Sequence, residues 1–290
     1  MPEYEQYQSR LDRRRDEAAR RAHSRRRIAM AVSVTLMLAV MAVVGGWVVY
    51  RVVKAEPKPT VRTYKVVLPE GLNNKEVAKS FDEETHGSVS QAQFIAATRA
   101  GSYDYQFLNG ANGNLEGFLF PNTYDVTSAT SANTAVNMML KDFGKETDEL
   151  EWSRAAQLVV TPYQIVTIAS IIEKEVKVPA ERPMVASVIY NRLKKKMKLG
   201  MCSTVLYALG QWKAKLSDKD LKVDSPYNTY LVDGLPPGPI CNPGFESIRA
   251  ALYPASTDAL FFILTNPDGH HSFTADYAQF LRWKDQQNKK

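Results

Sequence analysis

The hydrophobic pattern begins with a long apolar run near the amino terminus. Residues 28–50 contain no charged side chain, and Ser33 and Thr35 are their only serine or threonine residues. As a helix this run would be about 34 Å long, enough to cross a hydrocarbon core of about 30 Å. Trp47 and Tyr50 lie at its far end, where aromatic rings favour the membrane interface. We therefore expect a single transmembrane helix over residues 28–50.

Charges on either side of this run predict its orientation. Residues 1–27 contain nine arginines and five acidic residues, whereas residues 51–60 contain only three cations. Because the more basic flank stays on the inner side of a membrane, we expect residues 1–27 to form a cytoplasmic tail and residues 51–290 to be extracytoplasmic. A cleaved signal peptide is the alternative, but its apolar core usually has only about 7–15 residues and precedes a small-residue cleavage site.

After a proline-containing linker over residues 51–60, the pattern predicts a small α/β module. Alternating apolar and polar residues indicate a half-buried strand, and two stretches with helical spacing follow it. Ser90 and Gln93 form a capping-box pattern that opens the second helix, which ends at Gly101. The expected elements are a strand over 61–68, a helix over 73–84 and a helix over 91–101. Together they predict a compact module over residues 61–113.

Residues 114–290 predict a mainly helical domain with short strands. Its clearest helix start is Thr161-Pro162-Tyr163-Gln164, with threonine at the N-cap, proline in the first helical position and glutamine in the third. Expected helices cover 131–143, 161–177, 180–196, 203–209, 245–252 and 274–284, and expected strands cover 115–126, 260–265 and 271–273. The fold class is therefore α+β, with one transmembrane helix, a small α/β module and a mainly helical domain.

Composition and charge exclude several classes of protein. The 290 residues are 44% hydrophobic and 23% charged, as in ordinary globular proteins rather than disordered or low-complexity chains. The net charge of +6 comes mostly from the arginines of residues 1–27, so the rest of the chain is close to neutral. This distribution argues against a nucleic acid as partner.

The sequence lacks the motifs of common cofactor, metal and serine-hydrolase sites. It contains no P-loop, no dinucleotide-binding glycine fingerprint, no His-Glu-x-x-His and no Gly-x-Ser-x-Gly. His270 and His271 are adjacent, so they cannot bind one metal from the same helix face, and we expect neither a cofactor nor a metal. Cys202 and Cys241 permit one intramolecular disulfide, with two free thiols as the alternative.

A carboxylic acid at the end of an apolar helix is the main candidate for chemistry. Residues 165–172 are almost wholly apolar, and Glu173 follows one turn after Ala169 and Ser170, whose small side chains leave space beside it. Burial favours the protonated form of a carboxyl group, which a general acid for glycosidic bond cleavage needs. A solvated helix end is the alternative, and periodicity cannot choose between Glu173 and Glu175.

Several motifs occur in a fixed order along residues 61–285. They cover residues 115–124, 169–175, 181–182, 185–188, 191–193, 227–230, 234–240, 242–244, 250–254 and 271–273. In composition, order and spacing this set resembles the endolytic murein transglycosylase family, also called MltG or YceG-like.

The resemblance implies a membrane-anchored lytic transglycosylase that cuts nascent peptidoglycan strands internally. The cut bond is the β-1,4 bond between MurNAc and GlcNAc, the product end is 1,6-anhydro-MurNAc, and the cut terminates strand elongation. The catalytic acid falls on Glu173, residues 61–113 are a LysM-like glycan-binding module, and residues 114–290 are the catalytic domain. A non-catalytic, membrane-tethered glycan-binding scaffold and a muramidase that uses water are the alternatives.

The same resemblance suggests further site residues and partners. Candidate sugar-binding residues, each with capping or packing as the alternative role, are Glu116, Tyr190, Asn191, Tyr227, Asn228 and Tyr230. Many relatives have Asp-Pro-Thr-Val where residues 202–205 read Cys-Ser-Thr-Val, and the cysteine pair suggests a local disulfide in place of that aspartate. Expected partners are peptidoglycan strands, the lipid bilayer and cell-wall synthases such as penicillin-binding proteins, at a bacterial cell membrane.

Overall fold

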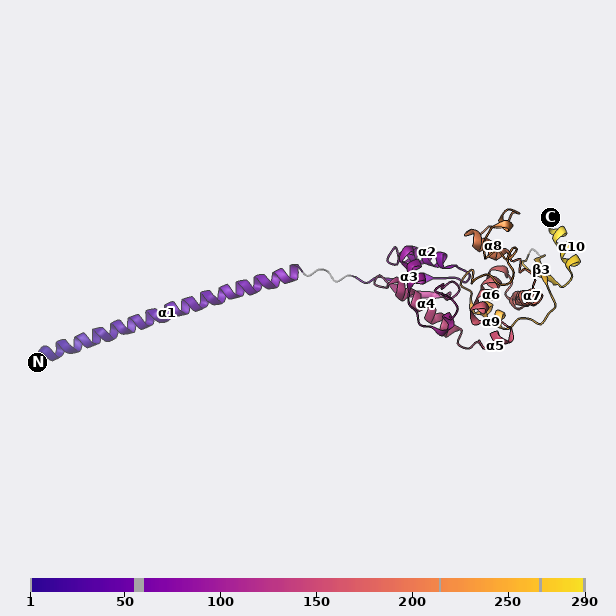
Figure 1. Cartoon of the computed structure of the whole chain (residues 1–290). Coiled ribbons are helices and arrows are strands. Elements are labelled where there is room, and N and C mark those ends of the chain that lie inside the picture. The colour runs from indigo at the N-terminus through magenta and orange to yellow at the C-terminus, as the bar shows by residue number, and fades with distance from the viewer. Residues whose placement is uncertain (1, 55–59, 214, 266–267, 289–290) are drawn as a thin grey trace. The chain divides into compact units, whose positions relative to one another are not determined.

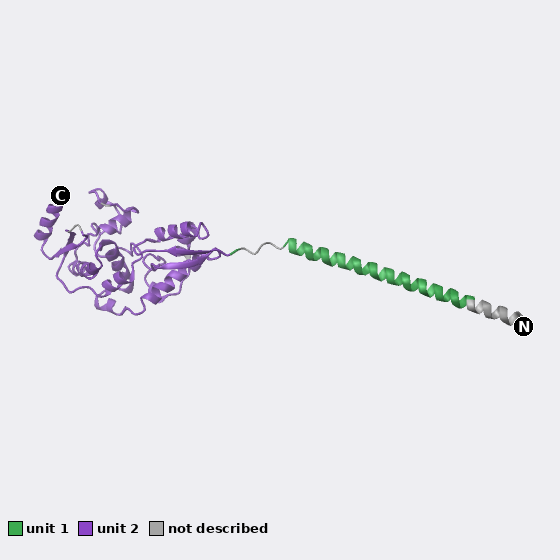
Figure 2. Cartoon of the chain, turned by 180° about the vertical axis from the view of Figure 1, so that it is seen from behind, with its two compact units in different colours: residues 1–60 green, residues 61–290 purple. Residues whose placement is uncertain are grey.

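The amino-terminal apolar run is part of one long helix, α1 (Pro2–Val53) (Figure 1). The computed structural model describes residues 2–54, 60–213, 215–265 and 268–288, in two compact units of residues 1–60 and 61–290 (Figure 2). The stretch Arg13–Val53 is long and apolar enough to cross a membrane, and its apolar side chains are exposed. Of the predicted linker, the first residues continue α1, and residues 55–59 lie outside the described residues.

The second unit begins with a β-α-α-β arrangement. Strand β1 (Thr63–Val67) pairs antiparallel with β2 (Thr123–Thr127), and α2 (Asn74–Glu84) and α3 (Gln91–Ala100) lie between them in the sequence. The two helices pack together through the stacked rings of Phe81 and Phe94, whose centroids lie 4.8 Å apart. The second strand of this arrangement therefore lies beyond residue 113, the predicted end of the module.

The strand predicted over 115–126 is also shorter than expected. Residues 116–118 form a turn and Leu119 a bend, and Gly117 has a φ of +94° that favours glycine. A Cβ atom at Gly117 would lie 2.5 Å from the Pro239 side chain. Phe118 and Leu119 are completely buried, so the apolar pattern that predicted a strand reflects burial of a turn by distant parts of the chain.

Helix α6 (Pro162–Glu175) is the central helix of the second unit (Figure 1). Residues 165–172 are buried without exception, which confirms the interpretation of this run as a helix buried on all sides. It packs against α7 (Arg182–Lys194), α8 (Cys202–Leu209) and α9 (Phe245–Leu252). These helices agree with the predicted ranges to within a few residues.

The remaining elements surround this helical core. They are α4 (Ala132–Glu146), α5 (Arg154–Gln157), α10 (Tyr277–Asn288) and the short 3₁₀ helices η1 (Gln106–Leu108), η2 (Pro179–Glu181) and η3 (Asp220–Lys222). Strands β3 (Phe261–Leu264) and β4 (His271–Thr274) pair antiparallel, which confirms the predicted hairpin. The mixed, mainly helical fold class is thus confirmed in outline.

The start of α6 predicts a measurable stability effect. Thr161 Oγ1 accepts a hydrogen bond from the Gln164 N–H at 3.2 Å, and Gln164 Oε1 accepts one from the Thr161 N–H at 2.8 Å. Thr161→Ala should therefore lower the free energy of unfolding by about 1 kcal/mol, measured by chemical denaturation of the full chain. Thr161→Ser keeps the hydroxyl group and should lose much less. Equal losses would exclude the hydroxyl group as the stabilising feature.

Candidate active site

Glu173 lies in the last turn of α6, directly after the buried run. Its side chain is 9% exposed, and its Oε2 accepts a hydrogen bond from the backbone N–H of Gly244 at 3.1 Å. Gly244 is the N-cap residue of α9, at a helix end where backbone N–H groups lack partners inside the helix. The start of α9 therefore holds the carboxyl group of Glu173 in a fixed direction.

Arg182, the first residue of α7, lies between two carboxyl groups. Its Nη2 is 3.7 Å from Glu173 Oε1 and 3.8 Å from Glu70 Oε2. Its Nε donates a hydrogen bond to Ser247 Oγ at 3.0 Å. The guanidinium group is thus fixed by α9 and shared by two acids that are far apart in the sequence. Gly244 belongs to the 242–244 motif of the sequence, whereas Glu70 has no local sequence signal that marks it as part of a site.

The residue after Glu173 faces a different group. Lys174 Nζ donates a hydrogen bond to the carbonyl of Gly71 at 3.2 Å and lies 3.8 Å from the ring centroid of Trp212. The Trp212 side chain is partly exposed. Lys174 therefore ties the loop after β1 and the loop after α8 to the end of α6, next to the acid.

The structure distinguishes the two acids that periodicity left open. Glu175 Oε1 accepts a hydrogen bond from the backbone N–H of Ser203 at 2.9 Å, at the start of α8. A carboxylate at a helix amino terminus stabilises that helix. Glu175 therefore has a structural role, while Glu173 lies beside Arg182 and Gly244.

Two cavities include in their walls residues that contact Glu173 or its neighbour Lys174. One of about 540 Å³ has Arg182 and Glu246 in its wall, and one of about 340 Å³ has Trp212 and Glu116 in its wall. Both are within the size range of small-ligand sites, about 300–1,000 Å³. Glu173 itself is in the wall of neither cavity.

Comparison with known proteins places this chain in a family. The model of the YceG-like family matches residues 47–286. The chain belongs to the YceG-like family. A crystal structure of a YceG-like protein from Listeria monocytogenes has a TM-score of 0.69 and 33% sequence identity, covering 75% of each chain. The family resemblance that the sequence motifs indicated is thus confirmed.

Two curated relatives of this YceG-like chain are named endolytic murein transglycosylase. The protein of Bacillus subtilis is 38% identical over 223 residues, which is 73% of this chain and 61% of the relative. The protein of Streptococcus pneumoniae strain R6 is 34% identical over 166 residues, which is 56% of this chain and 30% of the relative. The chain thus spans about six tenths and three tenths of the lengths of these relatives.

The predicted sugar-binding residues of α7 make contacts inside the fold. Tyr190 donates a hydrogen bond from its hydroxyl group to the carbonyl of Ala251 at 2.8 Å. Asn191 donates through Nδ2 to the carbonyls of Thr257 at 2.9 Å and Ala259 at 3.0 Å. Both residues also line a cavity of about 1010 Å³, which lacks Glu173 in its wall. These contacts favour the packing role over a direct role beside the acid.

The predicted residues between α8 and α9 are likewise engaged elsewhere. Asn228 is completely buried and donates through Nδ2 to the carbonyls of Leu221 and Val223. Tyr227 packs against Tyr207, with ring centroids 4.8 Å apart. In the described part of the chain, the polar contacts of these residues do not include Glu173. The capping and packing alternatives therefore fit the geometry better.

Glu116 is a buried acid outside the group around Glu173. Its Oε1 accepts a hydrogen bond from the Asn74 N–H at 2.9 Å, and its Oε2 accepts one from the Tyr207 hydroxyl group at 3.2 Å. Burial raises the pKa of Glu116 to about 8, against the lowering effect of these hydrogen bonds. Glu116 thus connects the start of α2 to α8 and need not carry a charge at neutral pH.

The predicted disulfide between Cys202 and Cys241 is wrong, because both thiols are free. Cys241 is completely buried, and its Sγ donates a hydrogen bond to the carbonyl of Ser170 at 3.3 Å. Cys202 is exposed at the start of α8, with its Sγ 3.2 Å from the Tyr230 hydroxyl group. The two thiols therefore have separate partners: the Cys241 thiol contacts the Ser170 carbonyl, and the Cys202 thiol contacts the Tyr230 hydroxyl group.

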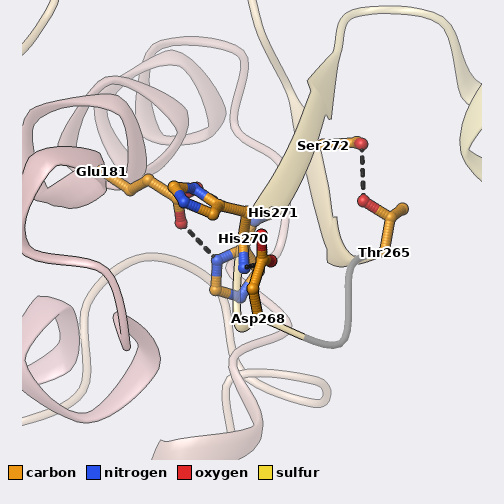
Figure 3. Close-up of polar contacts among 6 residues, drawn as sticks. All are labelled: Glu181, Thr265, Asp268, His270, His271 and Ser272. Atoms are coloured by element: carbon orange, nitrogen blue, oxygen red, sulfur yellow. Dashed lines mark hydrogen bonds and ion pairs between the residues drawn. The ribbon is translucent and has the colours of Figure 1, made fainter.

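Glu181 connects the β3–β4 hairpin to the start of α7 (Figure 3). Its Oε1 lies 3.0 Å from His270 Nδ1 and accepts from the His271 N–H at 3.0 Å, and its Oε2 lies 2.6 Å from His271 Nδ1. Burial alone would raise the pKa of Glu181, but the hydrogen bonds from His271 and His270 outweigh it and hold that pKa below its ordinary value. The adjacent histidines thus bind a carboxylate.

The contacts of Glu181 with His270 and His271 predict a pH-dependent stability effect. Because the folded state lowers the pKa of Glu181 from 4.5, the ionised side chain stabilises the fold above pH 4.5 and loses this effect as the pH falls through the folded-state value. Glu181→Gln should therefore be less stable than the wild type by about 1–2 kcal/mol at pH 7. Urea unfolding at several pH values should show this difference shrinking below pH 4.5. A constant difference down to pH 3 would contradict the explanation.

Proposed function

We propose that this protein is a membrane-anchored endolytic peptidoglycan transglycosylase in which Glu173 is the catalytic acid. The observation that carries the proposal is the position of the Glu173 carboxyl group, which is 9% exposed and lies between the Gly244 N–H and Arg182. A buried carboxyl group held in one direction suits proton transfer to a leaving group. The name of the curated relatives agrees with this chemistry.

The proposed reaction needs one acid and no water. Glu173 donates its proton to the oxygen that leaves with GlcNAc as the bond from this oxygen to C1 of MurNAc breaks. The Glu173 carboxylate then takes the proton of the C6 hydroxyl group, and the C6 oxygen forms a bond to C1. The products are a GlcNAc hydroxyl group and a 1,6-anhydro-MurNAc end, and Glu173 is protonated again. The Gly244 N–H and Arg182 stabilise the carboxylate formed between the two steps.

The other parts of the chain have proposed roles in bringing the acid to its substrate. We propose that α1 spans the membrane through residues 28–50, with residues 1–27 in the cytoplasm and residues 51–290 on the extracytoplasmic side. The exposed apolar side chains of α1 and the arginines before them support this orientation. The arrangement of β1, α2, α3 and β2 supports a LysM-like glycan-binding module, now extended to residue 127. Cleavage beside a cell-wall synthase would terminate the growing strand.

Analysis of product ends tests the proposed reaction. Full-length protein in detergent micelles is incubated with polymerised, uncrosslinked glycan strands, and the fragments are identified by mass spectrometry. Fragments of several lengths with 1,6-anhydro-MurNAc ends are expected. Reducing ends would indicate a muramidase that uses water, release of disaccharides alone would indicate cutting from strand ends, and binding without cleavage would indicate a scaffold. Each of these three results would overturn the proposal.

A further inference from the structure

The segment that carries Glu70 is fixed against the end of α6. Glu70 lies between β1 and α2 and precedes Gly71, whose φ of +83° favours glycine. The Gly71 N–H donates to the carbonyl of Asn242 at 2.9 Å, and the Gly71 carbonyl accepts from Lys174 Nζ at 3.2 Å. These two contacts of Gly71 hold the preceding residue, Glu70, near Glu173.

Gly244 lies between the side chains of Glu70 and Glu173. A Cβ atom on Gly244 would lie 1.8 Å from Glu70 Oε1, while the Gly244 N–H donates to Glu173 Oε2 at 3.1 Å. The Glu70 carboxyl group thus occupies the space that a side chain at position 244 would need. Glycine at this position lets a second acid approach the first.

The positive charge of Arg182 lies beside the proposed general acid, Glu173, and acts against that role. A positive charge favours the carboxylate form of a neighbouring acid, whereas a general acid must keep its proton until the leaving group takes it. The Nη2 atom of Arg182 that lies 3.7 Å from Glu173 also lies 3.8 Å from Glu70. A negative charge on Glu70 therefore offsets the effect of Arg182 on Glu173.

We propose that Glu70 is a positioning residue of the active site, a second carboxylate that shares Arg182 and thereby helps Glu173 to keep its proton. Glu70 acts through Arg182 and does not touch the reacting bond. The inference rests on the proposed role of Glu173 as the catalytic acid. It also gives the β-α-α-β module a part in the chemistry, because Glu70 follows β1.

Burial and three neighbouring charged groups act on Glu70. Burial raises the pKa of Glu70, and the negative charge of Glu173 raises it further. Arg182 lowers this pKa and Glu246 on α9 raises it. Lys174, the cation next to the acid on α6, directs its ammonium group to a backbone carbonyl instead. The two carboxyl groups thus share Arg182.

The pH dependence of kcat separates this role from a structural one. Full-length wild type and Glu70→Gln are assayed in detergent micelles on uncrosslinked glycan strands from pH 4.5 to 9, with anhydro ends counted by mass spectrometry. Without the charge of Glu70, the attraction of Arg182 for the carboxylate form of the acid is no longer offset, so the alkaline limb of the profile should move down by about 0.5–1 pH unit. The rate should fall about three- to tenfold at pH 8 and stay near that of the wild type at pH 5.

Three further variants control this experiment. Glu70→Ala also removes the carboxylate and should move the limb in the same direction, whereas Glu70→Asp keeps the charge and should return it toward the wild-type position. Glu83→Gln is the matched control, because it removes one exposed charge from α2, where Glu83 pairs with Lys79. An unmoved limb, or a uniform loss at every pH, in both Glu70→Gln and Glu70→Ala would overturn the inference. If the wild type leaves no anhydro ends, the proposed function fails instead.

Discussion

Replacing Glu173 with glutamine is expected to lower the rate of glycan cleavage by about 10²–10⁴-fold, the usual contribution of a general acid. Glutamine has the same shape and can still accept the hydrogen bond from the Gly244 N–H, but it cannot deliver a proton to the leaving oxygen. The measurement is kcat for the formation of anhydro ends by the full-length protein. Unchanged thermal unfolding of the variant would show that the loss is chemical.

Glu175→Gln is the matched control for this substitution. It changes the same residue type in the same helix turn, at a carboxyl group that accepts from the Ser203 N–H. The amide oxygen can replace this acceptor, so the rate should remain within about threefold of the wild type. Loss of activity in Glu175→Gln, or more than a tenth of wild-type activity in Glu173→Gln, would reassign the acid.

Replacing Asn242 with alanine is expected to cause a large loss of stability. Asn242 is 2% exposed, and its Oδ1 accepts from the N–H groups of Gly117 at 3.0 Å and Leu119 at 2.9 Å. Its Nδ2 donates to the Leu72 carbonyl and to Asn74 Oδ1. Alanine would leave several buried polar groups without partners, at a cost of about 3–5 kcal/mol. The melting temperature should fall by roughly 6–20 °C.

Asn137→Ala is the control for this stability effect. Asn137 is exposed on α4, and its Oδ1 accepts one hydrogen bond from the Tyr105 hydroxyl group at 2.9 Å. Because water can replace this contact, its loss should cost less than about 1 kcal/mol. Equal melting temperatures of Asn242→Ala and Asn137→Ala would contradict the view that Asn242 joins the module to the turn before β2.

The helices of the second unit are predictable because their signals are local. Ser90 with Gln93 and Thr161 with Gln164 form capping boxes in the structure as the sequence indicates. Each box involves side chains within one turn of the backbone groups that they bind, so tertiary packing is not needed to specify it. The apolar run of α6 is also a local signal, because a helix with apolar residues on all faces is expected to be buried.

Predictions failed where distant segments decide the conformation. Gly117 turns the chain because Pro239 and Asn242 lie against it, although the apolar residues nearby are typical of a strand. Likewise, the spacing of Cys202 and Cys241 permits a disulfide, but packing buries one thiol against the carbonyl of Ser170. In each case the deciding contact joins residues that periodicity cannot relate to each other.

The sequence by itself determined the apolar run of α1, the starts of the main helices, the family motifs and the presence of an acid at the end of α6. Periodicity left Glu173 and Glu175 open and the family resemblance pointed to Glu173; only the tertiary structure showed that the two carboxyl groups have different neighbours, which come from α7, α8 and α9. It also brought Glu70 to Arg182, across more than a hundred residues of sequence. Capping and periodicity act over one or two helix turns, whereas the charge environment of an acid depends on every segment that packs around it.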